Sequence, residues 1–501
     1  IQKMTKKILA VLLATALIGT IFSACGQSSN SNDHQLVTQT TTELTEDTTS
    51  FKLSYSQSDS LDPFESKTLN NQILSDLVFD SLFTLDETYE AQPNIAVSYS
   101  YTDSTTLTVV IKSGIVFSNG KQLTAENVVS SFYSAKESPR WKNELKAIKS
   151  AGAIDSNQIK FTLSYPNPNA HNLLTFSIAS AKRDKDNNPI GSGRYKYSQG
   201  GGSVKLKVNT KHPDFKPRFT EITLVNVPTS ESIDNAVNIG NITYAYRDLS
   251  EGDNVRLQCN KKMVSLNNLV YLGLNCYKSS IVSNVNIRRA ISLAIDRDTL
   301  VKSSYQGYGK SAESVFNPSS KQGKATKVFS ATADTVAAKQ AVAQSGVKQS
   351  HLKLTILTSD NQNRIAAAKL IKQQLEAVGF KVNINKEKPK DYKKDVKKKN
   401  FDIYIGETGV TDDMNLFSFF SKGGTTSYGI DQKKCETAKA YSNYMNGKKE
   451  IGDFMLKFSE EIPFVPVLYR QGMICYSKSL HGDMQGYVNN YFSNIEDWYC
   501  D

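Results

Sequence analysis

Histidine and tryptophan are scarce in this chain of 501 residues. The histidines are His34, His171, His212, His351 and His481. They stand singly and no HExxH pair occurs, so the sequence does not indicate a zinc enzyme, and it argues weakly against direct metal capture. Trp141 and Trp498 are the only tryptophans and form no clear platform for sugar binding. The sequence predicts no metal site and no cofactor.

Motifs of common enzyme classes are also missing. No Gly-x-Ser-x-Gly is present, which removes one signature of serine hydrolases. The stretch YQGYGKS at 305–311 ends like a phosphate-binding loop, but Ser304 stands where that pattern requires glycine. Acid pairs such as Asp412 with Asp413 are ordinary on surfaces, and nothing makes them a catalytic dyad. The sequence therefore predicts a protein that is not an enzyme.

Cysteine occurs six times but never as CxxC, which excludes a thiolate zinc knuckle and a thioredoxin-like site. Apart from Cys25, the cysteines are Cys259, Cys276, Cys435, Cys475 and Cys500. An odd number leaves at least one free thiol or an intermolecular bridge in an exported protein. Cys259 and Cys276 flank a predicted strand pair and are the first choice for a disulfide, with buried free cysteines as the alternative.

The one long apolar run is too short to be a simple membrane anchor. Fifteen apolar or weakly polar residues, Ile8 to Phe22, follow three lysines, whereas a spanning helix needs ~20. Two small residues then precede Cys25. This order predicts a secretory signal peptide over residues 1–24. It also resembles a bacterial lipobox, in which the cysteine is lipidated and begins the mature chain. An ordinary signal peptide with a chance cysteine is the alternative.

Charge and polarity vary along the chain. The formal net charge of +11 is a modest excess and no signature of nucleic-acid binding. In the lysine-rich stretch 386–400, Tyr392 and Val396 stand four apart as one inward stripe, which favours a solvated helix face over a phosphate-binding surface. Residues 26–50 are rich in Ser, Thr, Asn and Gln, so they predict a flexible tether.

After the tether, strand-like and helix-like segments alternate with short joints. Strand patterns occur at 51–57, 106–114, 158–165, 352–358, 381–386 and 401–407; helix patterns occur at 70–83, 124–138, 286–305 and 363–380. Thr124 is a plausible N-cap, with Asn127 three positions on. The alternation predicts α/β layers, the length predicts at least two domains, and no repeat of 20 to 50 residues suggests a solenoid.

Eight segments in a fixed order carry a family resemblance. They are LDPF at 61–64, QPNIAVSY at 92–99, KSGIVFSNGKQLTAENVV at 112–129, IGSGRYKY at 190–197, NIRRAISLAIDRDTLV at 286–301, QQLEAVGFKVNI at 373–384, FDIYIGETGVTDD at 401–413 and IPFVPVLY at 462–469. From about residue 51 to 501 this succession resembles the extracytoplasmic solute-binding proteins of peptide/nickel-type ABC importers, the oligopeptide- and dipeptide-binding family 5.

The resemblance implies a two-lobed α/β fold of the periplasmic-binding-protein kind (type II, cluster C) with an extra inserted subdomain. Lobe I would combine residues 51–82, 183–264 and 472–501. The inserted subdomain would cover 83–182, and lobe II 265–471. Cys25 and the tether would occupy 25–50. Two chain crossings would form a hinge on which the lobes close around a ligand.

The resemblance also implies a function. The chain would be a lipid-anchored, monomeric substrate-binding subunit on the outer face of the cytoplasmic membrane. It would capture short peptides and deliver them to an ABC permease and its ATPase subunits, without binding nucleic acid. The alternatives are an oligosaccharide, a nickel complex or haem as ligand, or a surface receptor or adhesin that kept the fold without transport.

Candidate ligand-binding residues follow from the same resemblance. In the family an acid of the second lobe holds the ammonium group of the peptide. Tyr404 and Glu407 would represent the family's aromatic residue and acid, and Asp412 its later aspartate. An alternative alignment places Gly409, next to Thr408, at the ammonium position.

Other candidates lie elsewhere in the chain. Gln57, Ser58 and Asn70 fall in first-lobe segments that often line the cleft. Asn275 matches a family asparagine near the cleft, or makes a strand-end hydrogen bond. Tyr469 ends a predicted strand, and Arg470 either meets a ligand carboxylate or braces the hinge.

Overall fold

The protein is described by a computed structural model that covers residues 46–249 and 257–501. The predicted signal peptide, Cys25 and the tether up to residue 45 lie outside the described residues. Asp47 is already bound to lobe I, because it forms an isolated parallel bridge with Phe219 and its N–H donates to the carbonyl of Arg218 over 2.7 Å. No helix in the described ranges has the length and apolar character of a membrane span.

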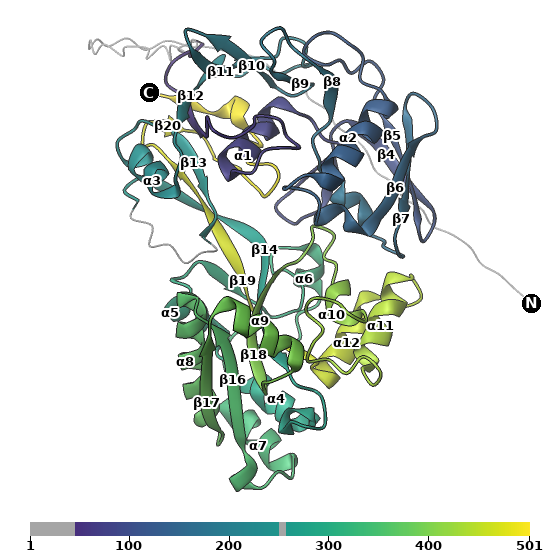
Figure 1. Cartoon of the computed structure of the whole chain (residues 1–501), viewed down its shortest axis with the longest axis vertical. Coiled ribbons are helices and arrows are strands. Elements are labelled where there is room, and N and C mark those ends of the chain that lie inside the picture. Colours follow the sequence, from purple (N-terminus) through teal and green to yellow (C-terminus); the bar gives the residue numbers. More distant parts are fainter. Residues whose placement is uncertain (1–45, 250–256) are drawn as a thin grey trace, which may run out of the picture. The chain divides into compact units, whose positions relative to one another are not determined.

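One mixed sheet extends through both lobes. Its strands are β1 (Lys52–Tyr55), β10 (Tyr195–Gly200), β11 (Ser203–Val208), β12 (Glu221–Asn226), β13 (Tyr244–Arg247), β14 (Asn260–Leu274), β15 (Gly309–Ser311), β16 (Lys353–Ser359), β17 (Lys381–Glu387), β18 (Ile403–Gly409) and β19 (Phe464–Tyr476). The order is β10-β11-β12-β1-β13-β19-β14-β18-β16-β17, with β15 also paired to β19. In Figure 1 the long strands β14 and β19 pass from one lobe into the other.

Lobe I contains the strands β10, β11, β12, β1 and β13, which are neighbours in the sheet in that order. It also contains α1 (Leu69–Val78) and α3 (Ser230–Asn238). The C-terminal segment returns to it with β20 (Leu480–His481) and β21 (Tyr499–Cys500). Its core is aromatic: Phe51 stacks on Phe219 with ring centroids 4.5 Å apart, and Trp498 packs against Tyr244 at 5.1 Å. The first and last described segments of the chain therefore share one core.

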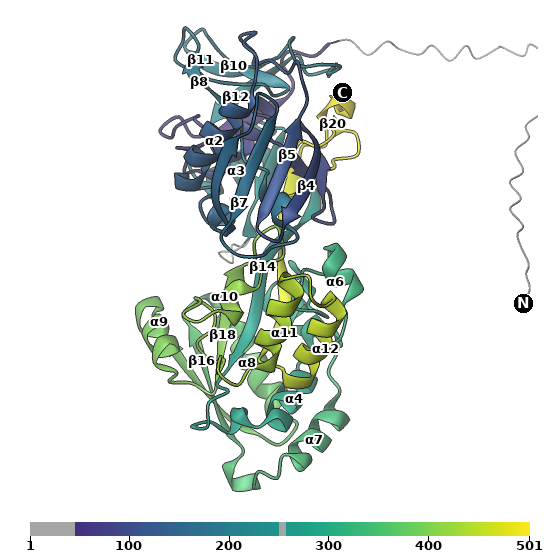
Figure 2. The ribbon, with the colours of Figure 1, turned by 90° about the vertical axis from the view of Figure 1, so that its right-hand side faces the viewer.

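The inserted subdomain has its own core, formed by residues between Leu82 and Ile190. Its elements are β2 (Phe83–Leu85), β3 (Ala91–Pro93), β4 (Ala96–Asp103), β5 (Thr106–Ile111), α2 (Ala125–Glu137), β6 (Ile148–Ala153), β7 (Gln158–Leu163), β8 (Ala179–Arg183) and β9 (Pro189–Gly191). The sheet order is β4-β5-β7-β6, and Figure 2 shows this sheet with α2 beside it. The predicted cap is confirmed, because the N–H of Thr124 donates to the side chain of Asn127 over 2.9 Å.

Lobe II has a hydrophobic core on each face of its sheet. One core contains Val270 and Leu272 of β14, and the other contains Leu269 and Tyr271, as strand alternation requires. The helices are α4 (Val285–Ala294), α5 (Arg297–Ser304), α6 (Lys321–Ala325), α7 (Thr335–Gln344), α8 (Gln362–Glu376), α9 (Pro389–Lys398), α10 (Phe417–Phe420), α11 (Glu436–Met445) and α12 (Ile451–Glu461). Residues of α4, α5, α7 and α8 belong to the first core, and residues of α9 to α12 to the second.

The helical pattern predicted over 286–305 forms two helices, α4 and α5, rather than one. The break has a local cause, because the Asp296 side chain accepts the N–H of Thr299 over 2.8 Å and so caps a new helix. The lysine-rich helix α9 is confirmed with its inward stripe. Val396 is buried, and the Tyr392 hydroxyl donates to the carbonyl of Ile405 over 2.6 Å.

The expected disulfide between Cys259 and Cys276 is wrong. The two residues flank opposite ends of β14, whose fifteen residues span about 50 Å at ~3.3 Å per residue. A disulfide requires Cα atoms less than about 7 Å apart. All five cysteines in the described ranges are free, as the alternative predicted, but Cys259 and Cys276 are partly rather than fully buried.

Glycine and tyrosine alternate across the β14–β18 pair. Tyr404 lies opposite Gly273, and Tyr271 lies opposite Gly406. A Cβ atom on Gly273 would lie 1.9 Å from the Tyr404 ring, and one on Gly406 would lie 2.4 Å from the Tyr271 ring. The two hydroxyl oxygens are 3.1 Å apart. Each tyrosine therefore covers the glycine of the neighbouring strand, and this fixes the register of β18 against β14.

We expect Gly273→Ala to destabilise the protein by about 1–3 kcal/mol, because the added methyl group overlaps the Tyr404 ring. Gly409→Ala is the matched control in the same strand pair. Nothing lies within 4 Å of the position of its Cβ, so its effect should stay within about 0.5 kcal/mol. Urea denaturation of both variants measures the difference, and equal midpoints would contradict the packing role of the pair.

Candidate functional site

The carboxyl ends of parallel strands from both lobes lie near the β14–β19 crossing. In lobe I, β12 and β13 run parallel to β1, and in lobe II, β18 runs parallel to β16. Gly409 at the end of β18 pairs with Asn268 of β14, and Arg247 at the end of β13 pairs with Met473 of β19. Ligands of open α/β sheets bind outside these carboxyl ends, so a ligand site is expected at the crossing.

The ladder between β14 and β19 is interrupted at the crossing. Ser265 pairs with Gln471, and the next pair is Leu269 with Tyr469. Between these two pairs β14 has three residues, 266–268, whereas β19 has one, Arg470. Such an irregularity disrupts the ladder and bends the strand locally, which suits a place where two lobes turn against each other.

Three charged side chains meet beside this interruption. Glu407 Oε2 lies 3.4 Å from the guanidinium of Arg364 and 3.5 Å from that of Arg470. The Arg470 side chain is buried, packs 5.0 Å from the ring centroid of Tyr305 and donates to the carbonyl of Leu249. We call Glu407, Arg364, Arg470 and Tyr305 the crossing cluster. Guanidinium groups held in this way can accept a carboxylate in a bidentate contact.

Part of β18 beside the crossing cluster has an open edge. β16 pairs with β18 only through Ile403 and Tyr404, although β18 continues to Gly409. Within the described residues, no strand is paired to the β16 side of β18 from Gly406 to Gly409. An open strand edge offers main-chain donors and acceptors to an extended chain.

A second polar group joins lobe II to the rest of the molecule. The Asp412 carboxylate accepts hydrogen bonds from Asn267 at 3.2 Å and from Asn489 in the C-terminal segment at 2.9 Å. Its N–H donates to Glu144 of the inserted subdomain over 3.0 Å. Asp413 accepts a hydrogen bond from Asn167, also of the inserted subdomain, at 2.6 Å. We call Asp412, Asp413 and Glu144, with these asparagines, the carboxylate interface.

Burial changes the acidity of all three carboxyl groups. Burial, reinforced by the charge of Asp413, raises the pKa of Asp412 to about 7. The hydrogen bonds from the asparagines and the more distant Arg140 oppose this rise without cancelling it. Burial and the charge of Asp412 raise the pKa of Glu144 well above its usual range, and burial also raises the pKa of Asp413. Protonation of these carboxyl groups therefore stabilises the carboxylate interface.

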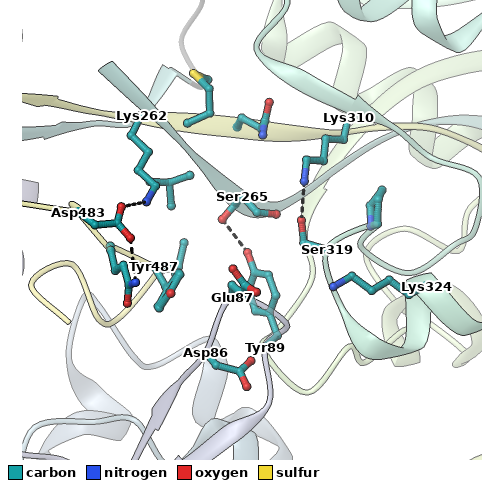
Figure 3. A pocket seen from close by; sticks show the side chains of 17 residues that line it. Asp86, Glu87, Tyr89, Lys262, Ser265, Lys310, Ser319, Lys324, Asp483 and Tyr487 are labelled. Carbon is teal, nitrogen blue, oxygen red and sulfur yellow. Dashed lines mark hydrogen bonds and ion pairs between the residues drawn. The ribbon is translucent and has the colours of Figure 1, made fainter. Parts of the chain in front are cut away.

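A cavity of about 390 Å³ lies next to the crossing, between residues of both lobes and the inserted subdomain (Figure 3). Lys262, Lys310 and Lys324 line it together with Asp86, Glu87 and Asp483. Lys262 pairs with Asp483 at 3.4 Å, Lys310 donates to Ser319 over 3.1 Å, and the Tyr89 hydroxyl donates to the carbonyl of Ser265 over 2.7 Å. We call this cavity the hinge pocket.

The hinge pocket and the crossing cluster lie on opposite faces of β19. Gln471 lines the pocket, whereas its neighbour Arg470 contacts Glu407, and successive residues of a strand point to opposite faces. In the described parts of the chain, no set of His, Cys, Asp and Glu side chains is gathered as a metal site. The pocket suits a ligand that carries charges of both signs, because its lysines and carboxylates can each meet an opposite charge.

The predicted residues of lobe I lie at the carboxyl end of β1 and in α1. Gln57 and Ser58 are exposed, and the N–H of Gln57 donates to Asn226 over 2.9 Å. The Asn70 amide donates to the carbonyl of Val227 over 3.4 Å. These residues surround the ends of β1 and β12, where a ligand could reach them.

The predicted residues of lobe II divide into two groups. Glu407, Thr408 and Gly409 end β18 at the crossing, next to Arg470. Asp412 lies in the carboxylate interface.

Three further predicted residues make internal contacts. Tyr404 is buried against Gly273, and the Tyr469 hydroxyl donates to the carbonyl of Val315 over 2.7 Å. Asn275 lies beyond the end of β14 that is remote from the crossing, where it donates to the carbonyl of Phe401 over 3.0 Å. This contact matches the strand-end hydrogen bond that was the alternative for Asn275.

Sequence reasoning missed Arg364 and Glu144. Arg364 lies in the first turn of α8, directly after β16, so the rule that ligands bind at strand carboxyl ends could have identified it. No sequence signal marks Glu144, because its partner Asp412 is far along the chain and only the fold brings the two together.

The raised pKa of Asp412 predicts a pH dependence of stability. Its folded-state pKa of about 7 lies above the usual value of 3.8, so the folded protein holds this proton more tightly than the unfolded chain does. The stabilisation is complete below about pH 4 and is lost as the pH rises through about 7. We expect Asp412→Asn to reduce the change in unfolding free energy between about pH 5 and pH 8 by on the order of 1–3 kcal/mol, measured by urea titration at both pH values.

Asp483→Asn is the control for this experiment. Asp483 is exposed, and its hydrogen bond with Gln485 and the charge of Lys262 lower its pKa, so its protonation does not change in that window. An unaltered pH dependence in Asp412→Asn would show that other groups carry it.

Comparison with known proteins agrees with this geometry. Residues 90–428 match the family model of bacterial extracellular solute-binding proteins, family 5. The chain is 23% identical over 477 residues to the oligopeptide-binding protein AppA of Bacillus subtilis, covering 85% of this chain and 87% of AppA. It is 27% identical over 323 residues to the nickel-binding protein NikA of Staphylococcus aureus, covering 61% and 63% of the two chains.

A solved structure supports the fold. The structure of CtaP, an ABC transporter substrate-binding protein of Listeria monocytogenes, aligns with a TM-score of 0.68 at 20% identity, covering 91% of this chain and all of that one. The predicted two-lobed α/β fold is thereby confirmed. The match to the family model covers more than half of the sequence. The chain therefore belongs to the bacterial extracellular solute-binding proteins of family 5, and it is a binding protein rather than an enzyme.

Proposed function

We propose that this protein is the lipid-anchored substrate-binding subunit of an ABC importer and that it captures short peptides between its lobes. The open edge of β18 from Gly406 to Gly409 is the observation that carries the proposal. A peptide added to this edge would gain main-chain hydrogen bonds with little dependence on its side chains. The similarity to the oligopeptide-binding protein AppA supports the same ligand class.

The crossing cluster would orient the peptide. Arg364 Nε is buried without a hydrogen-bond partner in the described part of the chain, so it is available to a ligand carboxylate. Glu407 and Gly409 are the two alternatives for the position that meets the ammonium group of the peptide. The Glu407 carboxylate contacts two guanidinium groups, whereas Gly409 has no side chain. Gln57, Ser58 and Asn70 would approach the peptide from lobe I, while Thr408 and Arg470 would complete the site in lobe II.

The division of the chain follows the sequence prediction. We propose lobe I from 51–82, 183–264 and 472–501, the inserted subdomain from 83–182, and lobe II from 265–471, with the core of the inserted subdomain continuing past these bounds to Leu82 and Ile190. Closure would occur where the ladder of β14 and β19 is interrupted, between Ser265 and Leu269. Closure would enclose the ligand and form the surface that the permease recognises.

The protein would work as a monomer on the outer face of the cytoplasmic membrane. Lipid attached to Cys25 would hold it there, and more than one acyl chain is needed for stable anchoring. The part of the predicted tether before Asp47, which is itself bound to lobe I, would supply the reach between the membrane and the permease.

A nickel complex is the second candidate ligand, favoured by the similarity to the nickel-binding protein NikA. A small complex with carboxylate groups could meet the same guanidinium groups of the crossing cluster. Peptides remain the first proposal because an open strand edge is of use to an extended main chain.

We expect a library of short peptides to raise the melting temperature by a few degrees, since binding at about 100 times Kd stabilises a protein by about 2.7 kcal/mol. Arg364→Ala should weaken the binding of the best peptide at least about tenfold, because a charge-assisted contact contributes ~1.5–3 kcal/mol. Differential scanning fluorimetry and isothermal titration calorimetry measure both effects.

Lys324→Ala is the matched control, because it removes a positive charge from the hinge pocket and leaves the crossing cluster intact. Loss of binding in Lys324→Ala alone would move the site to the pocket. A response to nickel complexes with none to peptides would favour the second candidate.

We expect Cys25→Ala to release the protein from membranes into the soluble fraction, because the acyl chains would have no attachment point. Fractionation of cells that express the full-length chain, followed by immunoblotting, measures the distribution. Cys500→Ser is the control and should stay with the membrane. Membrane retention of Cys25→Ala would contradict lipid anchoring.

A further inference from the structure

Two cysteines that are far apart in sequence lie together at the lobe I end of the crossing strands. Lys261 of β14 pairs with Cys475 of β19, and Asn260 pairs with Tyr476. Cys259 is two residues before Lys261, so the alternation of the strand puts it on the same face as Cys475, in a diagonal position. Both cysteines belong to one apolar cluster with Met473 and residues of α3.

The two thiols lie in one cluster on the same face and are chemically unequal. A hydrogen bond from the Cys475 thiol to the Cys259 sulfur acts on the pKa values of both. That bond is the largest influence on Cys259 and lowers its pKa to about 7 against the opposing effect of burial. The same bond and burial raise the pKa of Cys475. Cys475 is buried, whereas Cys259 is partly exposed. Cys259 is therefore the accessible nucleophile and Cys475 the buried partner.

The other three cysteines have different surroundings. The Cys276 thiol donates to the carbonyl of Pro463 over 3.7 Å, and the Cys435 thiol donates to the carboxylate of Glu461 over 3.5 Å. Burial raises the pKa of Cys276 to about 11 and that of Cys435 to about 12. Burial also raises the pKa of Cys500. These thiols stay protonated, and a protonated thiol is a poor nucleophile.

We propose that Cys259 and Cys475 are a redox site that closes to a disulfide across the two crossing strands. The oxidant would be another disulfide, either in a thiol–disulfide oxidoreductase or in a small molecule such as oxidised glutathione. The Cys259 thiolate attacks one sulfur of that disulfide, whose S–S bond breaks and releases a thiolate. Cys475 then loses its proton and attacks the Cys259 sulfur, which forms the internal bond and releases the second thiolate of the oxidant.

The electrons balance in this sequence. Two protein thiols lose two electrons and two protons, and the external disulfide gains both as two thiols. The product accounts for the odd cysteine count, because one pair is oxidised and Cys276, Cys435 and Cys500 remain thiols. The inference does not depend on the proposed function, since it rests on the strand register and not on any ligand.

The disulfide would stabilise the crossing without blocking it. It closes a loop that contains all of lobe II, and long loops lose the most entropy in the unfolded chain when they are cross-linked. The bond lies at the beginning of β14, whereas the interrupted ladder lies between Ser265 and Leu269. Closure of the lobes at that interruption would remain possible.

Thiol mapping of the full-length protein tests the proposal. The protein is incubated with oxidised glutathione, alkylated without reduction, digested and analysed by mass spectrometry. We expect one cross-linked peptide pair containing Cys259 and Cys475, lighter than the two thiol peptides by two hydrogen atoms, with Cys276, Cys435 and Cys500 alkylated. Alkylation of both Cys259 and Cys475, or a bond from either one to another cysteine or a second chain, would overturn the proposal.

Thermal unfolding provides a second measurement. We expect the melting temperature of the wild-type protein to be about 5 °C higher after oxidation than in dithiothreitol. Cys259→Ser should abolish this difference, and its partly exposed site tolerates serine. Cys276→Ser is the matched control and should keep the difference. The same oxidation-dependent rise in Cys259→Ser would overturn the assignment even if the chemical mapping were ambiguous.

Discussion

The pairing of β14 with β19 is the interaction on which the rest of the structure depends. These two strands carry the chain between the lobes and place the strand ends of both lobes at one location. Their ladder is interrupted opposite Arg470, between Ser265 and Leu269, and its register shifts once more between Val270 and Tyr271. A continuous ladder resists bending whereas an interrupted one bends locally, so the element that joins the lobes also contains the position at which a hinge would act.

Charge is concentrated around this gap on both faces of the sheet. One face carries Glu407 between Arg364 and Arg470, and the other carries the lysines and carboxylates of the hinge pocket. Asn267, within the gap, also donates to Asp412 of the carboxylate interface. Buried charges are costly unless they are paired or neutralised by protonation. Arg364 and Arg470 are paired with the Glu407 carboxylate, which reduces the cost of burying their charges. The acids of the carboxylate interface are instead stabilised by binding protons. The relative position of the lobes therefore depends on electrostatics as well as on apolar packing.

Much of the local structure could be predicted because its causes are local. The cap at Thr124 and the inward stripe of α9 follow from neighbours within one or two helical turns. The failures have the opposite origin. The break between α4 and α5 depends on the side chain of Asp296, which the apolar period of the flanking helices concealed. The wrong disulfide assumed that Cys259 and Cys276 flank a strand pair, whereas one long strand separates them.

The sequence by itself determined the α/β class, the family and the segment Glu407 to Gly409 as part of a candidate site, since these depend on residue order and local pattern. Only the tertiary structure decided which distant groups meet. It brought Arg364 to Glu407, Glu144 to Asp412 and Cys475 to Cys259. It also placed the Tyr404 ring over Gly273 of the neighbouring strand. Contacts between residues remote in the chain arise from strand register and core packing, which no local pattern encodes.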